Sequence, residues 1–401
     1  MTTLRAQDIA EKVEAFVREV VLPYERDPRC GPHGPSEDLV RELRDKARAA
    51  GLLTPHILPD GSHLTQVETA TVLKKSGLSP LGPVAVNTAA PDEGNMFLLG
   101  RIGTVEQKRR YLAPLLAGAR SAFFMTEPAA EGGAGSDPSM LKTMAVRSNS
   151  GWMVNGRKAF ITGAQGASVG IVMARTTEGA RLGVPGDARI RATMFLVELP
   201  HPAIRIERIL DTIDSSMPGG HAVVAIEDLR LDESQVLGEV DEGFRYAQIR
   251  LAPARLSHCM RWFGAATRAQ EIAVDYAVRR EAFGKRLIDH EGVGFMLAEN
   301  LIELQQASLM IDWCAAVLDS GAPGTAESSI AKVAVSEALY RVADRCVQVL
   351  GGTGVTGDTV VEQVLRETRA FRIYDGPTEV HKWSIAKGIK RAALALPPGH
   401  R

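Results

Sequence analysis

The stretch FFMTEPAAEGGAGSD, Phe123 to Asp137, lies where one sequence pattern gives way to another. Its proline and glycine cluster predict a loop, and its hydroxyl and backbone N–H groups would suit a polar ligand such as a phosphate or the edge of a flavin. Helical periodicity precedes the stretch, and short strand-like runs follow it. The fold class can be worked out from this change of pattern.

Before the loop, from Asp8 to about Ser121, apolar residues recur at helical spacing. The segment IAEKVEAFVREVVL places Ile9, Val13 and Phe16 three or four residues apart. LVRELRDKARAAGLL repeats the pattern and ends at a glycine, and EQKRRYLAPLLAGA repeats it again. We therefore predict an N-terminal α-helical domain over residues 1–121.

After the loop, from about Ala122 to Val236, short β-branched or alternating runs alternate with turn residues. These runs are GWMVNGRKAFI, SVGIVMART, ATMFLVEL and HAVVAIEDLRL, and they predict a middle antiparallel β domain over residues 122–236. Long helical patterns return from Gly243, which predicts a C-terminal helical-bundle domain over residues 237–401. Separate blocks of helices and strands indicate an α+β multidomain protein and disfavour a doubly wound fold.

Composition narrows the class of partner. The 401 residues carry 47 basic and 48 acidic side chains, a net charge of -1 without like-charge runs, so neither nucleic acid nor an anionic membrane is favoured as a partner. The widely spaced Cys30, Cys259, Cys314 and Cys346 form no zinc-binding or disulfide pattern, and no metal is expected. We see no signal peptide and no stretch near about 20 apolar residues, so we expect a soluble, cytoplasmic protein.

The segment GGTGVTG, Gly351 to Gly357, contains the spacing G-x-G-x-x-G. A dinucleotide fingerprint follows a strand, whereas the preceding residues predict a long amphipathic helix, so we reject a Rossmann site. A glycine-rich helix stop is the simple interpretation. Close approach of this backbone to a pyrophosphate of another kind stays open.

The segment FRIYDGPTEVHKW, Phe371 to Trp383, sets Asp375 on a glycine-proline turn. An aspartate in such a place most often bonds its own backbone. No neighbouring His or Ser pattern suggests a triad, so catalysis by a nucleophilic hydroxyl is unsupported. The segment RREAFG, Arg279 to Gly284, falls in a break between two long helices and on its own indicates a charged helix end.

Taken together, these motifs are far more specific. FFMTEP…GSD, AFITG, R-x-x-FG, QVLGG and Y-D-G-P-x-E-V-H occur in the order found in the acyl-CoA dehydrogenase family, which the sequence resembles over nearly its whole length. APDEGNM, SMPGGH and DGPTEVH resemble one branch of it, whose animal members carry such a domain behind a kinase-like one. Arg255 precedes Arg280 by 25 residues, as in that family.

The resemblance implies a fold and a reaction. The fold is an N-terminal helical domain, a middle β domain and a C-terminal four-helix bundle, with FAD between them and across a subunit interface. The reaction is the α,β-dehydrogenation of an acyl-CoA thioester to trans-2-enoyl-CoA: a carboxylate takes the α-proton and flavin N5 takes the β-hydride. Asp375 matches the base, one methylene shorter than the usual glutamate, while the position of an alternative glutamate is Ala254.

The resemblance also implies partners: electron-transfer flavoprotein as electron acceptor and a homodimer or homotetramer. An acyl carrier protein could replace CoA as the thioester carrier. Two other functions stay open, a flavin oxidase acting on a nitroalkane or other small carbon acid and a flavoprotein scaffold without turnover. A relative that oxidises nitroalkanes also uses an aspartate base.

Residues carried over from the family fall into two groups. The residues matching FAD-binding positions are Phe124, Met125, Thr126 and Ser136 of the loop, Phe160, Ile161 and Thr162 of the strand end, Arg280, Phe283, Gln348, Gly351 and Gly352 facing a neighbouring subunit's FAD, and Thr378 and Glu379. The residues matching positions near the thioester are Ser136, Arg255, Tyr374 and Gly376. Thr162 matches a threonine that approaches flavin N5.

Overall fold

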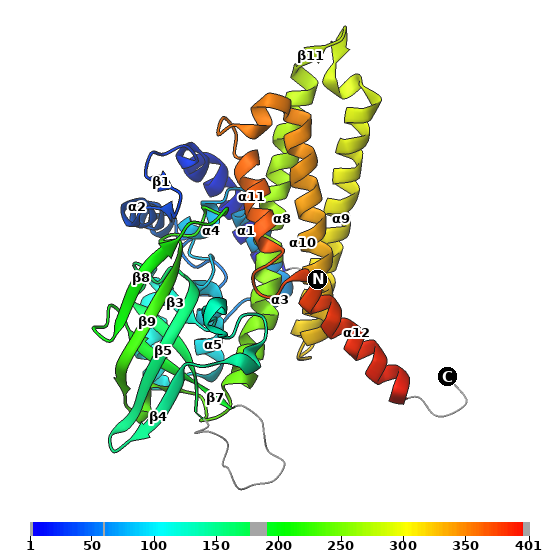
Figure 1. Ribbon diagram of the computed structural model, residues 1–401. Coiled ribbons are helices and arrows are strands. Elements are labelled where there is room, and N and C mark those ends of the chain that lie inside the picture. Colours follow the sequence, from blue (N-terminus) through cyan, green and yellow to red (C-terminus); the bar gives the residue numbers. More distant parts are fainter. Residues whose placement is uncertain (1–2, 59–60, 177–190, 396–401) are drawn as a thin grey trace. The chain divides into compact units, whose positions relative to one another are not determined.

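The chain forms two compact units, which together contain the helices and one large sheet. The computed structural model describes residues 3–58, 61–176 and 191–395. The first unit comprises Met1–Arg26, His56–Pro83 and Ala252–Arg401, and the second comprises Asp27–Pro55 and Val84–Leu251. The predicted order along the chain, helices followed by strands followed by long helices, is confirmed (Figure 1).

The sheet belongs to the second unit. Its strands in the described residues are β3 (Ser121–Phe124), β4 (Met144–Ser148), β5 (Gly151–Thr162), β6 (Val169–Arg175), β7 (Ala192–Glu198), β8 (Ile204–Leu210), β9 (His221–Leu231) and β10 (Val236–Leu237). They lie in the order β10-β7-β6-β4-β5-β9-β8, and β3 pairs with β6. The four predicted runs are β5, β6, β7 and β9.

The sheet is antiparallel except along β6. Strand β3 runs parallel to β6, with Ser121 opposite Val169 and Phe124 opposite Val172, and β4 meets β6 at one parallel position. The predicted antiparallel β domain is thus present, with the pairings of β3 and β4 to β6 as parallel exceptions that the sequence did not indicate. The physical reason is that β3 enters the sheet from a helix instead of from a hairpin, and only a hairpin obliges its two strands to run antiparallel.

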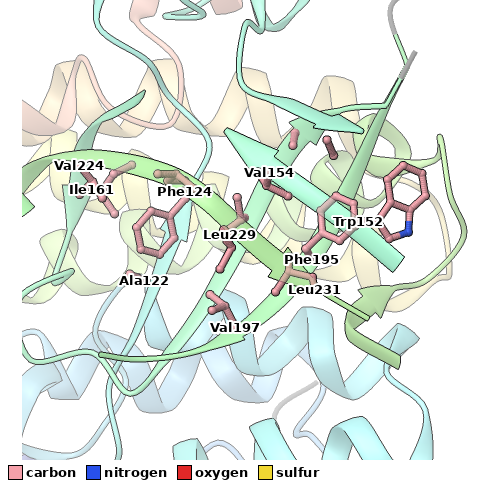
Figure 2. Packing of buried hydrophobic residues seen from close by; sticks show 14 of the residues in the cluster. Ala122, Phe124, Trp152, Val154, Ile161, Phe195, Val197, Val224, Leu229 and Leu231 are labelled. Atoms are coloured by element: carbon pink, nitrogen blue, oxygen red, sulfur yellow. The ribbon is translucent and has the colours of Figure 1, made fainter. Parts of the chain in front are cut away.

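Both faces of the sheet are buried along β6 and β7. On β6 and β7, Val172, Ala174, Phe195 and Val197 point into one apolar cluster, while the alternating residues between them point into another that includes Met96, Leu98, Leu99, Tyr111 and Leu115. Figure 2 shows the first cluster, in which the rings of Trp152 and Phe195 lie 5.5 Å apart at 62°. Successive side chains of a strand point to opposite faces, and both faces are buried here. These strands therefore read as continuous apolar runs.

Helices of the second unit supply the other cluster. They are α2 (Glu37–Ala49), α5 (Asp92–Ile102), α6 (Val105–Gln107), the π-helical turn η3 (Lys108–Leu112) and α7 (Ala113–Leu116). Helix α2 begins at Ser36, whose side chain accepts a hydrogen bond from the Leu39 N–H. The region expected to be all helical also holds a two-strand hairpin, β1 (Cys30–Gly31) and β2 (Gly34–Pro35).

The first unit is helical. It contains α1 (Leu4–Phe16), η1 (Val17–Val21), α3 (Gln66–Ser76), α8 (Gly243–Arg279) from Ala252 onward, α9 (Glu291–Asp319), α10 (Thr325–Leu350), η8 (Gly351–Val355), α11 (Val361–Phe371) and α12 (Thr378–Ala395). The long α9 and α10 lie side by side, and α11 and α12 pack on α10 (Figure 1). The R-x-x-FG break is a hairpin of β11 (Glu281–Ala282) and β12 (Lys285–Arg286).

The glycine-rich segment follows a helix, as predicted. Helix α10 ends at Leu350, and Gly351 begins the short 3₁₀ turn η8 with φ of 59°. A dinucleotide fingerprint of the Rossmann type needs a strand at this place. The rejection of that site is therefore confirmed by the local structure.

Helix α9 corrects one expectation. By length and composition it could cross a membrane, with a mean hydropathy of 1.2 over its most apolar window, of which 28% is buried within the chain. The sequence did not indicate this helix as a possible span because acidic residues interrupt its apolar run. Glu303 pairs with Arg341 and Arg345 of α10, so one side of α9 is packed against protein through charged contacts.

Two glycines let α3 and α8 approach closely. A Cβ atom on Gly77, at the end of α3, would lie 1.9 Å from the carbonyl oxygen of Arg261, and one on Gly264 of α8 would lie 2.2 Å from the carbonyl oxygen of Lys74. Backbone atoms cannot move aside as a side chain can. The packing of α3 against α8 therefore requires glycine at both positions.

We predict that Gly264→Ala destabilises the protein by about 3 kcal/mol, because the added methyl group forces the two backbones apart. Gly388→Ala in α12 is the matched control: a Cβ there meets no atom of the described residues within 4 Å, and helix propensity should stabilise that variant by up to about 1 kcal/mol. Denaturant unfolding measures both. Equal effects of the two substitutions would contradict the close approach.

Candidate functional site

The turn that carries Asp375 has an unusual backbone. Asp375 and Gly376 both have positive φ, 52° and 103°, between α11 and α12. A Cβ atom on Gly376 would lie 2.5 Å from Nε2 of His381, so this position admits only glycine. A non-glycine residue in this conformation costs on the order of 1 kcal/mol. Other interactions must therefore hold the turn.

Three buried basic side chains supply those interactions. Arg255 of α8 and His381 of α12 each donate to the carbonyl oxygen of Asp375 at 3.1 Å. Lys332 of α10 donates to the carbonyl oxygen of Gly376 at 2.7 Å. All three side chains are at most 9% exposed. The turn is thus anchored to α8, α10 and α12 through its main chain. The Asp375 carboxylate is not needed to hold the turn and can interact with other groups.

A histidine lies beside the Asp375 carboxylate. Nε2 of His258 is 3.4 Å from Oδ2 of Asp375, and the aspartate side chain is 22% exposed against 6% for the histidine. The His258 ring also contacts Tyr374, with ring centroids 4.8 Å apart. Sequence reasoning missed His258. The available signal was its position one helical turn after Arg255, which places both on one face of α8.

Burial controls the charges of this cluster. It lowers the pKa of His381 to about 4, with help from the charges of Arg255 and Lys332. It lowers the pKa of Lys332 to about 8, and it lowers the pKa of Arg255 against the opposing charge of Asp375. His381 is consequently neutral at pH 7, with its ring proton on Nε2 because a carbonyl oxygen can only accept.

Of the other residues predicted in this unit, Thr378 and Glu379 differ in exposure. Thr378 is buried, and its hydroxyl donates to Glu337 Oε1 at 2.6 Å, the oxygen that also accepts from Arg372. Glu379 is exposed. The Thr378 side chain therefore serves the turn, while Arg255, Tyr374, Asp375 and Gly376 come together in one cluster.

The residues predicted to reach a neighbouring subunit's cofactor are exposed. Phe283 is 97% exposed at the tip of the β11–β12 hairpin, directly after the exposed Arg280 segment. Gln348 is exposed at the end of α10, and a Cβ atom on Gly351 or Gly352 would meet nothing within 4 Å in the part of the chain that the structure describes. An arginine, an aromatic ring and an open glycine backbone suit a ligand with phosphate groups and a flat base.

In the second unit, a buried carboxylate fixes the FFMTEP…GSD loop. Glu127 accepts from the N–H groups of Lys142 and Thr143, both at 2.8 Å, and from that of Ala134 at 3.2 Å. The ammonium of Lys158, fully buried, lies 3.1 Å from Glu127 Oε1. These contacts tie Glu127, near the start of the loop, to Ala134 within the loop and to the segment that follows it.

The protonation of this pair follows from its surroundings. Burial lowers the pKa of Lys158 to about 8, against the charge of Glu127. Burial acts to raise the pKa of Glu127, but Lys158 and the hydrogen bonds from Thr143 outweigh it and lower that pKa. A carboxylate that accepts this many hydrogen bonds stays ionised.

Beside the loop, β5 turns an aromatic ring outward. Thr126 and Ala159 exchange hydrogen bonds, with the Ala159 N–H 3.0 Å from the Thr126 carbonyl oxygen. The next residue, Phe160, has φ of 56° and is 61% exposed, at an irregularity of the ladder between Lys158 and Ile161. An exposed ring beside hydroxyl and backbone donors fits the flat, polar-edged ring system of a flavin.

The other predicted residues of the second unit divide by burial. The side chains of Phe124 and Ile161 are buried in the sheet core, so these two residues can offer a ligand only their main chain. Met125 is partly buried against the helical cluster, and Ser136 is exposed. Phe124, Met125, Thr126, Phe160 and Thr162 come from adjacent strand ends.

Thr162 ends a chain of hydrogen bonds that the sequence did not reveal. Its hydroxyl oxygen lies 2.9 Å from Nδ1 of His221, and Nε2 of His221 lies 2.7 Å from Oδ2 of Asp214. The sequence analysis found no hydroxyl–imidazole–carboxylate set. The segment SMPGGH contains this histidine, but only the pairing of β5 with β9, which sets Thr162 opposite His221, gives it a partner.

Comparison with known proteins places these features in a family. Models of the acyl-CoA dehydrogenase N-terminal, middle and C-terminal domains match residues 3–119, 122–219 and 241–390. Acyl-CoA dehydrogenase family member 11 of Gallus gallus is 34% identical over 96% of the chain, which spans only 50% of that relative. The protein named "Probable acyl-CoA dehydrogenase FadE2" of Mycobacterium tuberculosis is 35% identical over 96% of the chain and 95% of its own length.

A solved structure agrees. A Mycobacterium abscessus structure assigned to the acyl-CoA dehydrogenases superposes with a TM-score of 0.86 at 33% identity, covering 98% of this chain and 100% of its own. The likeness therefore extends over all the elements described above.

We predict that acid destabilises the protein partly through His381. Its pKa is about 4 when folded against 6.5 ordinarily, so below pH 6.5 the unfolded state takes up a proton that the folded state refuses. The stability contribution is complete above pH 6.5 and is lost as the pH falls towards 4, by about 3 kcal/mol.

Unfolding free energies of the wild type and His381→Gln across this range provide the test. The glutamine variant should lose less stability on acidification than the wild type does. Equal losses would remove His381 from the acid response.

Proposed function

Because the chain belongs to the acyl-CoA dehydrogenase family, we propose that it is an FAD-dependent enzyme that dehydrogenates an acyl-CoA thioester to trans-2-enoyl-CoA, with Asp375 as the base. The observation that carries this proposal is the Asp375 turn: its main chain is anchored by buried Arg255, Lys332 and His381, while its carboxylate stays partly exposed. Such a carboxylate is positioned to exchange a proton with a ligand.

Asp375 would take the proton from the carbon α to the thioester. That proton is weakly acidic, so the carboxylate has to be held within hydrogen-bond reach of it, and hydrogen-bond donors have to meet the charge that develops on the thioester oxygen. Because the aspartate side chain is short, the position of the main chain determines how far the carboxylate extends. The hydrogen bonds from Arg255, Lys332 and His381 fix that position. His258, 3.4 Å from Oδ2, limits the rotation of the carboxylate.

FAD would supply the acceptor of the β-hydride at N5. In this proposal Thr126, Ser136, Phe160 and Thr162, with the main chain of Phe124, Met125 and Ile161, hold the flavin. Arg280, Phe283, Gln348, Gly351 and Gly352, together with Thr378 or Glu379, serve its pyrophosphate and adenine end, reaching across to a neighbouring subunit. Ser136, Arg255, Tyr374 and Gly376 would contact the thioester and its CoA or carrier-protein part. The exposed ring of Phe160 and the open Gly351 and Gly352 support this assignment.

A homodimer or homotetramer would cover the exposed apolar face of α9. Phe295, Ile302 and Leu309 recur at intervals of seven residues and are 57–65% exposed, and Trp313 extends the row. Monomeric soluble proteins rarely leave such a row uncovered. Burial in a subunit interface would also account for the high hydropathy of this helix.

We further propose electron-transfer flavoprotein as the electron acceptor, a cytoplasmic location, and domain boundaries near residues 121 and 236.

We predict that Asp375→Asn keeps bound FAD, seen as yellow colour, and slows its bleaching by acyl-CoA about 10²–10⁴-fold, because the general base is lost. Asp344→Asn, at an exposed position of α10, is the control and should bleach normally. Anaerobic titration with a panel of acyl-CoAs measures both variants.

The same titration separates the alternatives. Reduction of Asp375→Asn at the wild-type rate would remove Asp375 from its role. Wild-type FAD that no acyl thioester bleaches would indicate a scaffold. Rapid reoxidation by air with peroxide release would favour an oxidase.

We predict that Arg280→Ala weakens FAD retention and subunit association together, because this exposed arginine would serve the cofactor of a neighbouring subunit. Arg279→Ala is the matched control, since Arg279 is also exposed and pairs with Asp275 of its own helix. Flavin content after gel filtration and the elution volume give the two readouts. Unchanged occupancy in Arg280→Ala would count against a shared site.

A further inference from the structure

The Asp214–His221–Thr162 chain is nearly enclosed in the second unit. The Asp214 side chain is 6% exposed and that of His221 is 13% exposed. His221 lies on β9 opposite both Thr162 of β5 and Leu210 of β8, so neighbouring strands hold its ring in place. Residues directly opposite each other on adjacent strands share one face of the sheet, which keeps Thr162 and His221 in contact.

The charge of Asp214 fixes the direction of the hydrogen bond between Asp214 and His221. Burial acts to raise the pKa of Asp214, but hydrogen bonds from His221 and the Thr212 hydroxyl lower it. An ionised carboxylate can only accept, so Nε2 of His221 carries a proton. Nδ1 accepts from the Thr162 hydroxyl when Nε2 carries the only ring proton, and it donates to that hydroxyl when both nitrogens are protonated.

We propose that Nε2 carries the only ring proton of His221 and that Asp214 and His221 are positioning residues for Thr162: the Thr162 hydroxyl donates to Nδ1, so that Thr162 presents only its oxygen lone pairs to a bound cofactor. This inference rests on the proposed function, in which Thr162 helps to hold the flavin, and on the match of Thr162 to the family threonine that approaches flavin N5. N5 carries a hydrogen in the reduced cofactor and a lone pair in the oxidised one. An acceptor at Thr162 therefore favours the reduced cofactor, and the chain of three residues biases bound FAD towards accepting a hydride.

Asp214→Asn tests the direction of the chain. The amide can donate to Nε2, which moves the ring proton to Nδ1 and frees the Thr162 hydroxyl to donate to the oxidised cofactor. A carboxylate-to-amide change shifts a histidine tautomer in this way in serine proteases. The equilibrium between oxidised and reduced bound FAD should move about tenfold towards oxidised, which is ~30 mV lower in midpoint potential for a two-electron couple.

The sign of this shift distinguishes the tautomer from simple electrostatics. Removing a negative charge near a cofactor that gains electrons would raise the midpoint potential, whereas freeing the hydroxyl should lower it. His221→Phe, which removes both ring nitrogens, should lower it as well. Asp211→Asn is the matched control, since Asp211 lies three residues away and is 98% exposed. It should leave the potential unchanged.

A double substitution isolates the role of the hydroxyl. In a Thr162→Val background, Asp214→Asn should cause no fall in the midpoint potential, because the group that it acts on is gone. A fall of the same size in that background would overturn the proposal, and so would an unchanged or raised potential in Asp214→Asn alone.

A second measurement needs neither bound cofactor nor a variant. Nitrogen chemical shifts of His221 in the wild-type apoprotein should report a neutral ring with its proton on Nε2. A proton on Nδ1, or on both nitrogens, would overturn the proposal.

The outcomes also separate this inference from the proposed function. Bleaching of wild-type FAD by acyl-CoA, with an unchanged potential in Asp214→Asn, would leave the dehydrogenase assignment and remove the positioning role. A lowered potential in that variant, without bleaching of the wild type by any acyl-CoA, would do the reverse.

Discussion

The carbonyl oxygens of Asp375 and Gly376 are the acceptors on which the candidate site depends. Two successive left-handed residues turn both carbonyls into the interior, where an unpaired carbonyl costs about 1–3 kcal/mol. Arg255, His381 and Lys332 pair them. Because these donors come from α8, α12 and α10, the turn cannot move without disturbing all three helices.

Burying these charged donors in the first unit costs free energy. Burial opposes the charges of Lys332 and Arg255, and a buried charge is tolerated only when it is well hydrogen-bonded. Replacing such groups by apolar ones would often stabilise a protein. Their presence here is explained by the turn, because no apolar side chain could donate to its carbonyls.

In the second unit buried polar groups also hold a loop, but there a buried anion accepts hydrogen bonds from backbone N–H groups, whereas in the first unit buried donors bind backbone carbonyl oxygens. The buried anion, the carboxylate of Glu127, gathers backbone N–H groups from Ala134, Lys142 and Thr143, and one buried cation, Lys158, balances it. In both units an irregular segment is fixed by a buried charge that saturates its backbone groups. An irregular segment leaves backbone groups unpaired, and neighbouring helices and strands cannot pair them because their own backbone groups already bond one another. Buried side chains must therefore supply the partners.

How much the sequence predicted varies with the range of the interaction. The strands over 151–162, 169–175, 192–198 and 221–231 and the long helices were all predicted, because the period of apolar residues is a local property that burial of one face imposes. The parallel pairing of β3 with β6 was missed, since strand order depends on contacts between distant segments. The hydropathy of α9 was underestimated because Glu299, Glu303 and Asp312 interrupt its apolar residues.

By itself, then, the sequence determined the order of elements, the loop at Phe123–Asp137, the family and the position of Asp375 on a turn. The tertiary structure alone decided what surrounds these residues: His258 beside the Asp375 carboxylate, three buried hydrogen-bond donors on its turn, and His221 and Asp214 behind Thr162. The reason is physical. Periodicity and turn preference act within a few residues, whereas a hydrogen bond between Thr162 and His221 exists only once the sheet has set their strands side by side.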